Sequence, residues 1–151
     1  MSEVNTATRP AGRSQPGQLA RLRMASFGAV TMLIIQFILG IVYNLYGTAP
    51  TKAKSVGLFS SPVLALHVIM SLLLLIAAVM LLVRAIGARH RLTIWMSAVG
   101  LIGIVAAGGA GIAFAGNGAA GSSLGMSIAF AVSLVCYVII LVLVPSSPST
   151  T

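Results

Sequence analysis

Four long apolar segments without a single Asp or Glu constrain this chain more than any other feature. A helix needs about 20 predominantly apolar residues to cross the hydrocarbon core of a bilayer, and each segment reaches that length. The predicted spans are residues 24–46, 63–83, 92–115 and 124–144. The sequence therefore predicts an all-α integral membrane protein, built as an up-down four-helix transmembrane bundle.

The composition supports a single membrane domain. Of the 151 residues, 58% are hydrophobic and 7% are charged, whereas about 25% of an average soluble domain is charged. The first residues are rich in Ser, Thr, Gly, Pro and Arg, so we expect a disordered basic N-terminal tail over 1–23. We expect a second disordered tail over 145–151, which leaves 24–144 as the transmembrane domain.

The basic residues near the ends of the spans indicate the orientation. Seven arginines lie in the N-terminal tail or between the second and third spans, and two lysines, Lys52 and Lys54, lie on the other side. This asymmetry predicts that both termini are cytoplasmic. The short loops and the basic tail suit a bacterial plasma membrane, and the net charge of +8 favours contact with anionic lipid headgroups. Aromatic residues are not interleaved with the arginines, so we expect no nucleic-acid partner.

The polar residues do not form catalytic machinery. The single acidic residue, Glu3, lies in the tail, so the spans contain no carboxylate for proton exchange. The sequence has no acid–base pair, activated nucleophile or phosphate-binding loop. Cys136 is the only cysteine, which excludes an internal disulfide and a cysteine metal cluster. We predict no catalytic residues, and no metal site other than that of a haem iron.

Small residues mark the third span as a packing helix. Nine of the 16 glycines fall between Gly100 and Gly125, and Gly103, Ala107 and Gly111 follow one another at four-residue intervals. Small residues at this spacing let helix backbones approach closely in a bilayer. We expect this stripe to contact a neighbouring helix of the bundle or a second copy of the chain.

Polar residues in the first two spans predict a polar interior. Gln36, Gly40 and Asn44 fall at four-residue intervals on one face of the first span. Ser71 lies one turn after His67 on the second span. Because an unsatisfied polar group is costly in hydrocarbon, these side chains should face the inside of the bundle. Interhelical hydrogen bonding is one interpretation, and the lining of a ligand or solute path is the other.

His67 is the residue that we single out for function. A histidine within a span is a functional-site hypothesis by default, and the structural alternative is a hydrogen bond near the membrane interface. Axial ligation of haem is the sharper hypothesis, since an imidazole and a thioether form a recognised axial pair. Met126 opens the fourth span at a depth that matches that of His67. His67 and Met126 are therefore the candidate haem ligands.

Two short motifs resemble one four-helix half of the haem A synthase family. They are Gln36-Phe37-Ile38-Leu39-Gly40 in the first span and Leu64-Ala65-Leu66-His67 at the start of the second. The resemblance implies a ligand-bearing histidine near the outer ends of the second and fourth helices; His67 occupies the first position, and Met126 stands at the second. The family also has an extracytoplasmic glutamate and often a cysteine pair, whereas the loop over 47–61 has neither. This difference argues against haem A synthesis by this chain.

Two functions therefore remain open. The first is a small polytopic membrane protein without catalytic machinery that is a subunit or scaffold of a larger membrane assembly. Its partners would be other membrane protein subunits or a second copy of the chain. The second is a b-type haem-binding membrane protein, with His67 as axial ligand, that transfers electrons or handles haem. The sequence leaves open whether a cofactor is bound.

Overall fold

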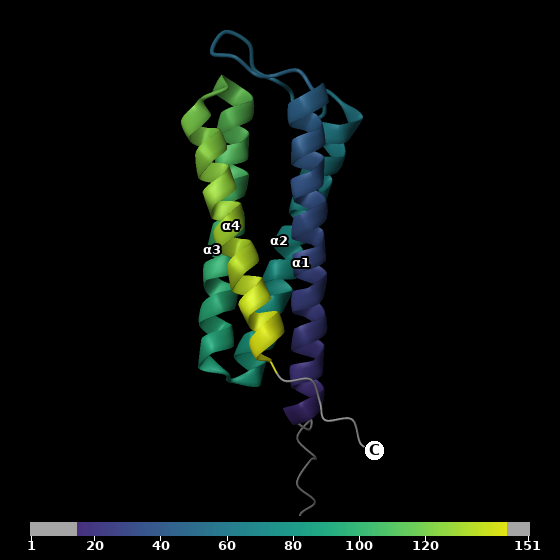
Figure 1. Ribbon diagram of the computed structural model, residues 1–151, viewed down its shortest axis with the longest axis vertical. Coiled ribbons are helices and arrows are strands. Elements are labelled where there is room, and N and C mark those ends of the chain that lie inside the picture. Colours follow the sequence, from purple (N-terminus) through teal and green to yellow (C-terminus); the bar gives the residue numbers. More distant parts are fainter. Residues whose placement is uncertain (1–14, 145–151) are drawn as a thin grey trace, which may run out of the picture.

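The computed structural model describes residues 15–144 and contains four helices (Figure 1). They are α1 (Gln15–Tyr46), α2 (Pro62–Ala88), α3 (Arg91–Asn117) and α4 (Ala120–Leu143). All four are long and apolar enough to cross a membrane. The predicted all-α architecture is confirmed. The outer parts of the expected tails, 1–14 and 145–151, lie outside the described residues.

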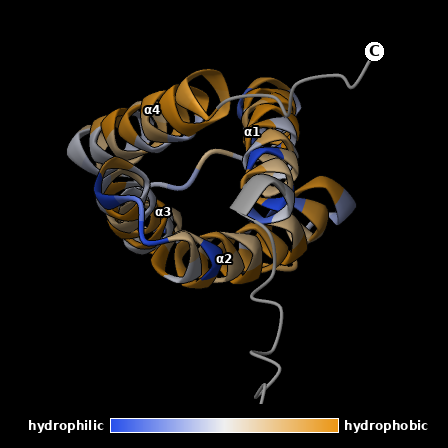
Figure 2. Ribbon diagram, turned by 90° about the horizontal axis from the view of Figure 1, so that it is seen from below, coloured by the Kyte–Doolittle hydropathy of each residue, from blue (hydrophilic) through white to orange (hydrophobic). Residues whose placement is uncertain are grey.

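The helices form a ring in which each helix packs against the next and α4 closes onto α1 (Figure 2). The diagonal pairs, α1 with α3 and α2 with α4, make no backbone contact. Consecutive helices run antiparallel, so α1 begins and α4 ends at the same end of the bundle (Figure 1). We call this the terminal end, and the opposite end, which carries the α1–α2 connection, the loop end. This is the predicted up-down topology.

Helix α1 begins earlier than the sequence predicted. It starts at Gln15, so residues 15–23 are helical rather than part of a disordered tail. Leu22 is fully buried, and Leu19 packs against the same core cluster. Two leucines on one helix face are enough to dock this segment, because most helical stability in proteins comes from the packing of an apolar face. The sequence prediction failed here because the segment is polar on average, although it contains these two leucines.

The first residues of α2 specify where it starts. Ser61 is the N-cap, and its hydroxyl accepts a hydrogen bond from the backbone N–H of Leu64 at 3.2 Å. Pro62 follows at the start of the first turn, where its fixed φ and missing N–H cost nothing. At the other end of α2, Arg89 has a left-handed φ of 54°, which reverses the chain before α3.

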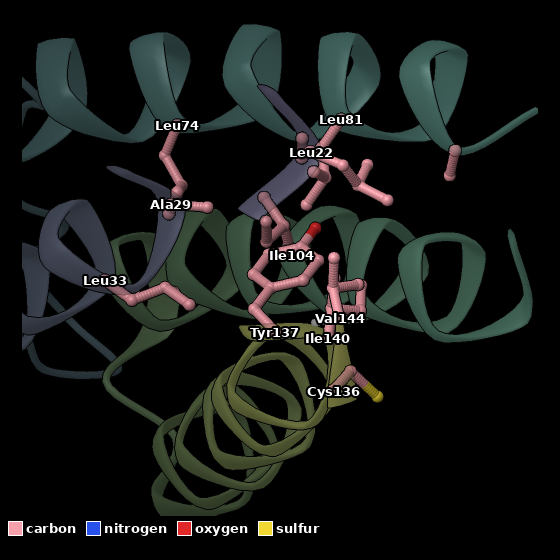
Figure 3. Packing of buried hydrophobic residues seen from close by; sticks show 12 residues of the cluster. Leu22, Ala29, Leu33, Leu74, Leu81, Ile104, Cys136, Tyr137, Ile140 and Val144 are labelled. Carbon is pink, nitrogen blue, oxygen red and sulfur yellow. The ribbon is translucent and has the colours of Figure 1, made fainter. Parts of the chain in front are cut away.

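Buried side chains concentrate toward the terminal end and the middle of the bundle, and Figure 3 shows how the labelled members of this cluster pack together. The core cluster consists of Leu22, Ala29, Leu33, Leu74, Ala78, Leu81, Ala85, Ile104, Cys136, Tyr137, Ile140 and Val144. Between α1 and α4, the rings of Phe37 and Phe130 stack with their centroids 5.4 Å apart. Figure 1 shows the α1–α2 and α3–α4 hairpins farther apart at the loop end than at the terminal end.

The segment 47–61 crosses the loop end and ties the two hairpins together. The backbone N–H of Val56 donates to the Ala115 carbonyl at the end of α3, at 2.9 Å. Pro50 is buried, and its carbonyl lies directly against Gly118 in the turn between α3 and α4. Gly118 has a φ of +64°, which glycine adopts without the steric cost of a Cβ.

Gly118→Ala should therefore destabilise the protein by about 1–3 kcal/mol, from the strain of a left-handed alanine and its clash with Pro50. The matched control is Gly121→Ala, because a Cβ at Gly121 meets nothing within 4 Å. That change should be neutral or slightly stabilising, since alanine favours the helix. Thermal unfolding in detergent followed by circular dichroism measures both variants. Equal melting temperatures for the two variants would contradict the tie between the hairpins.

Candidate functional site

Polar side chains from α1 and α2 form a hydrogen-bonded cluster between the two helices. The Gln36 Nε2 group donates to the Ser71 hydroxyl and to the His67 backbone carbonyl, the latter at 3.1 Å. The Ser71 hydroxyl donates to the same carbonyl at 2.9 Å. Gln36 is 8% exposed. The structure thus places Gln36 and Ser71 together, in the interhelical bonding that the sequence offered as one interpretation.

The His67 ring lies against α1 at Gly40. A Cβ built on Gly40 would be 3.5 Å from His67 Cε1, an ordinary van der Waals distance, so the imidazole packs next to this position of α1. His67 Nδ1 is buried and has no hydrogen-bond partner among the described residues, and neither has the Gln36 Oε1 atom. The structural alternative for His67 called for a hydrogen bond of the ring, and Nδ1 makes none. Both unpartnered atoms belong to the α1–α2 interface.

Asn44 does not join this cluster. It is exposed in the last turns of α1, whereas Gln36 is buried and Gly40 faces His67. The reason is helical drift: an α-helix turns about 100° per residue, so eight residues carry Asn44 about 80° around the axis from Gln36. The expected polar interior therefore ends before Asn44.

The two candidate haem ligands lie on diagonal helices. Met126 is half-buried on α4, and its sulfur would be 3.4 Å from a Cβ on Gly111 of α3. His67 faces α1, and α2 and α4 make no backbone contact. The described contacts therefore do not bring Met126 and His67 together.

The small-residue stripe of α3 packs against α4 of the same chain. A Cβ on Gly103 would lie 2.9 Å from the Ala129 carbonyl oxygen, and Gly111 faces Met126. Ala107, between them, is half-buried. Of the two partners expected for this stripe, the neighbouring helix of the bundle is the one that occupies it.

Sequence reasoning missed the partner of this stripe on α4. The Ser133 hydroxyl lies within reach of the Gly100 carbonyl at 3.0 Å and the Ala129 carbonyl at 2.9 Å. The Tyr137 ring covers Gly100, and Tyr137 is 0% exposed. Ser133 and Tyr137 are four residues apart, on one face of the helix. The sequence signal that could have identified this contact was the four-residue spacing of Ser133 and Tyr137 together with the glycines of α3.

A cavity of about 220 Å³ lies at the loop end. Its lining is formed by Tyr43, Thr48, Lys54, Ser55, Val56, Gly57, Ser60 and Ser61. The Tyr43 hydroxyl donates to the Thr48 carbonyl at 3.0 Å, which holds one wall in place. The hydroxyls and the lysine suit hydrogen bonding to polar groups at the membrane surface.

The described residues contain no group of three His, Cys, Asp or Glu side chains that could hold a metal ion. Their polar chemistry consists of hydrogen-bonding groups and two histidines, His67 and His90, which lie at different places in the bundle. Comparison with protein-family models, with curated protein sequences and with solved structures found no match to this chain.

Proposed function

We propose that the protein is a non-catalytic subunit or scaffold of a larger membrane assembly, and that another membrane helix docks on the free face of α3. The α3 docking face consists of Ala106, Gly109, Ala113 and Gly116. All four residues are exposed, and a Cβ on Gly109 or Gly116 would meet nothing within 4 Å. This uncovered row of small residues is the observation that carries the proposal.

The α3 docking face points away from the contact with α4. Gly109 follows Gly100 by about two and a half turns, so it lies on the opposite side of α3 from the glycine that Tyr137 covers. Lipid offers no hydrophobic force for helix association, so helices associate where small residues permit close packing. Gly109 and Ala113 form such a small-xxx-small pair. Helix α3 would thus hold α4 on one side and a partner helix on the other.

Site-specific photocrosslinking in native membranes tests this proposal. A photoreactive residue in place of Ala113 should form an adduct with one protein partner. The same residue in place of Val142, which is 73% exposed on α4, should give lipid adducts only. The mass of the adduct separates a second copy of the chain from another subunit. Lipid adducts alone at both positions would overturn the proposal.

A pair of glycine variants supplies the matched control. Gly109→Ile should remove the crosslink from Ala113, because its side chain prevents the close approach of the partner. Gly87→Ile should leave the crosslink intact: a Cβ on Gly87 also meets nothing within 4 Å, and Gly87 lies on α2. A crosslink that survives Gly109→Ile would contradict docking on this face.

We propose further that the terminal end faces the cytoplasm of a bacterial plasma membrane and contacts anionic headgroups. Support comes from the position of the charges. The described arginines all lie toward the terminal end, and Lys52 and Lys54 lie in the segment that crosses the loop end. In a variant without Cys136, a cysteine at Ser55 should react with an impermeant maleimide added to whole cells, and one at Arg89 should not.

A b-type haem protein is the second candidate function, and the unpartnered His67 imidazole favours it. The motifs that resemble the haem A synthase family point the same way. A metal-bound histidine usually donates its other ring N–H to an oxygen acceptor, and Gln36 Oε1 is the second unpartnered buried atom at this interface. His67 is the axial ligand in this second proposal, whereas Met126 packs on Gly111. A bound haem would supply one-electron redox chemistry.

A reduced-minus-oxidised visible spectrum of the purified protein, expressed with haem available, tests this second function. The expected result is a Soret band and an alpha band that are lost in His67→Ala. The control is His90→Ala, because His90 is exposed between α2 and α3, and its Nδ1 atom lies 2.9 Å from the Thr93 hydroxyl. A colourless wild-type protein, or bands that persist in His67→Ala, would refute ligation by His67.

A further inference from the structure

The cavity at the loop end presents hydrogen-bond donors and no acidic group. We call it the loop-end cavity. Lys54, Ser55 and Ser60 lie in its lining and are exposed, so a molecule at the membrane surface can reach them. A lysine offers three N–H donors and no acceptor, and each serine offers a hydroxyl. The only acidic residue of the chain is Glu3, so the positive charge of Lys54 has no carboxylate side chain as partner within residues 15–144.

Backbone hydrogen bonds hold the wall of the loop-end cavity in place. Thr51 and Lys54 exchange backbone N–H···O bonds of 3.0 and 3.1 Å. The Val56 N–H donates to a carbonyl at the end of α3 at 2.9 Å, and the Ser60 N–H donates to the Gly57 carbonyl at 3.0 Å. These bonds use main-chain atoms and leave the side chains of Lys54 and Ser60 available to a ligand. A wall that is already ordered lowers the entropic cost of binding.

The charges around the loop-end cavity favour a small anion. Ser61 belongs to the lining and is also the N-cap of α2, and the N-terminus of a helix carries a partial positive charge. Lys54 adds a full positive charge. The volume of about 220 Å³ is below the range of about 300–1,000 Å³ that is typical of sites for drug-sized ligands. The loop-end cavity therefore suits one compact group whose oxygens accept hydrogen bonds.

The position of the loop-end cavity indicates which oxyanion is at hand. Tyr43 lies in the last turn of α1 and Ser61 caps the first turn of α2, so the cavity sits where these two apolar helices end (Figure 1). Tyr46 and Phe59, in the same region, are 85% and 70% exposed. Exposed aromatic side chains are enriched at the level of the lipid headgroups. Phosphate is the oxyanion that a bilayer presents at this level.

We propose that the loop-end cavity binds a phosphate group, with Lys54 as its charged partner and the Ser55 and Ser60 hydroxyls as hydrogen-bond donors. Lysine is a common phosphate binder and acts as a point charge. The phosphodiester of an anionic phospholipid and free inorganic phosphate share this chemistry. Phosphatidylglycerol should bind more tightly than phosphatidylcholine, because the described residues offer the choline cation no carboxylate.

Selective ¹⁵N labelling of serine gives a readout that is local to the loop-end cavity. Short-chain phosphatidylglycerol, added to the full chain in micelles of an uncharged detergent, should shift the amide signals of Ser55 and Ser60 until they saturate. Lys54→Gln should weaken this binding about tenfold, through loss of a charge-assisted hydrogen bond. Lys52→Gln is the matched control, because it removes the same charge two residues away at a site outside the lining. Its binding should weaken less than about twofold.

A second titration separates the two sources of phosphate. Saturation by phosphatidylglycerol but not by inorganic phosphate would assign the site to a lipid headgroup, whereas saturation by inorganic phosphate at equal affinity would assign it to the free ion. An unshifted amide signal of Ser133, which is buried between α3 and α4, shows that Lys54→Gln is folded. Absence of saturable shifts with both ligands, or equal losses in the two lysine variants, would overturn the proposal.

Discussion

Replacing Gly103 with valine should lower the free energy of unfolding by about 3 kcal/mol, because α3 and α4 touch at this residue. A Cβ on Gly103 would lie 2.9 Å from the Ala129 carbonyl oxygen and still closer to the Ser133 hydroxyl. Ser133 can rotate its side chain, but the Ala129 oxygen belongs to the backbone. The clash is relieved only if α4 moves away from α3 along much of their contact.

Gly108→Val is the matched control for this substitution. Gly108 lies on the same helix, and a Cβ there meets nothing within 4 Å. Both variants exchange a helical glycine for the same β-branched residue, so their difference isolates the contact with α4. Reversible unfolding in mixed micelles with a denaturing detergent, followed by circular dichroism, measures it. Equal losses in the two variants would show that α3 and α4 are not held together at Gly103.

The helices were predictable because length and hydropathy determine them. A stretch of about 20 apolar residues has few alternatives to a membrane helix, so all four helices matched. The start of α1 was not predictable in this way, because it depends on Leu19 and Leu22 reaching a core formed by other helices. Contacts between distant parts of the chain cannot be predicted from the composition of one short segment.

The candidate site was also predictable only in part. The four-residue spacing predicted that Gln36 and Gly40 face one neighbour, and both contact α2. The same spacing failed at Asn44, because drift around the helix accumulates with each step. It also could not say which helix receives a stripe of small residues: Gly103 and Gly111 face α4, and the spacing is equally compatible with a second chain.

Gln36→Ala should destabilise the protein by about 2–4 kcal/mol. The substitution removes two hydrogen bonds from α1 to α2, each worth about 0.6–2 kcal/mol in a bilayer, and leaves a void where a side chain that is 8% exposed had packed. The Ser71 hydroxyl keeps its bond to the His67 carbonyl, so no additional donor is orphaned. Asn44→Ala, at an exposed site on the same helix, should change stability by less than about 0.5 kcal/mol.

Gln36→Leu divides this loss between packing and hydrogen bonding, because leucine restores most of the volume and none of the bonds. If Gln36→Leu lowers the free energy of unfolding by about 1–2 kcal/mol, the hydrogen bonds of Gln36 help to hold α1 and α2 together. If Gln36 also supplies the acceptor for an iron-bound His67, the leucine variant should in addition shift or broaden any visible bands of the protein, since the partner of a ligating histidine tunes the metal. A leucine variant as stable as the wild-type protein would contradict the role of Gln36 in joining α1 and α2, and visible bands that the leucine variant leaves unchanged would contradict its role as acceptor for His67.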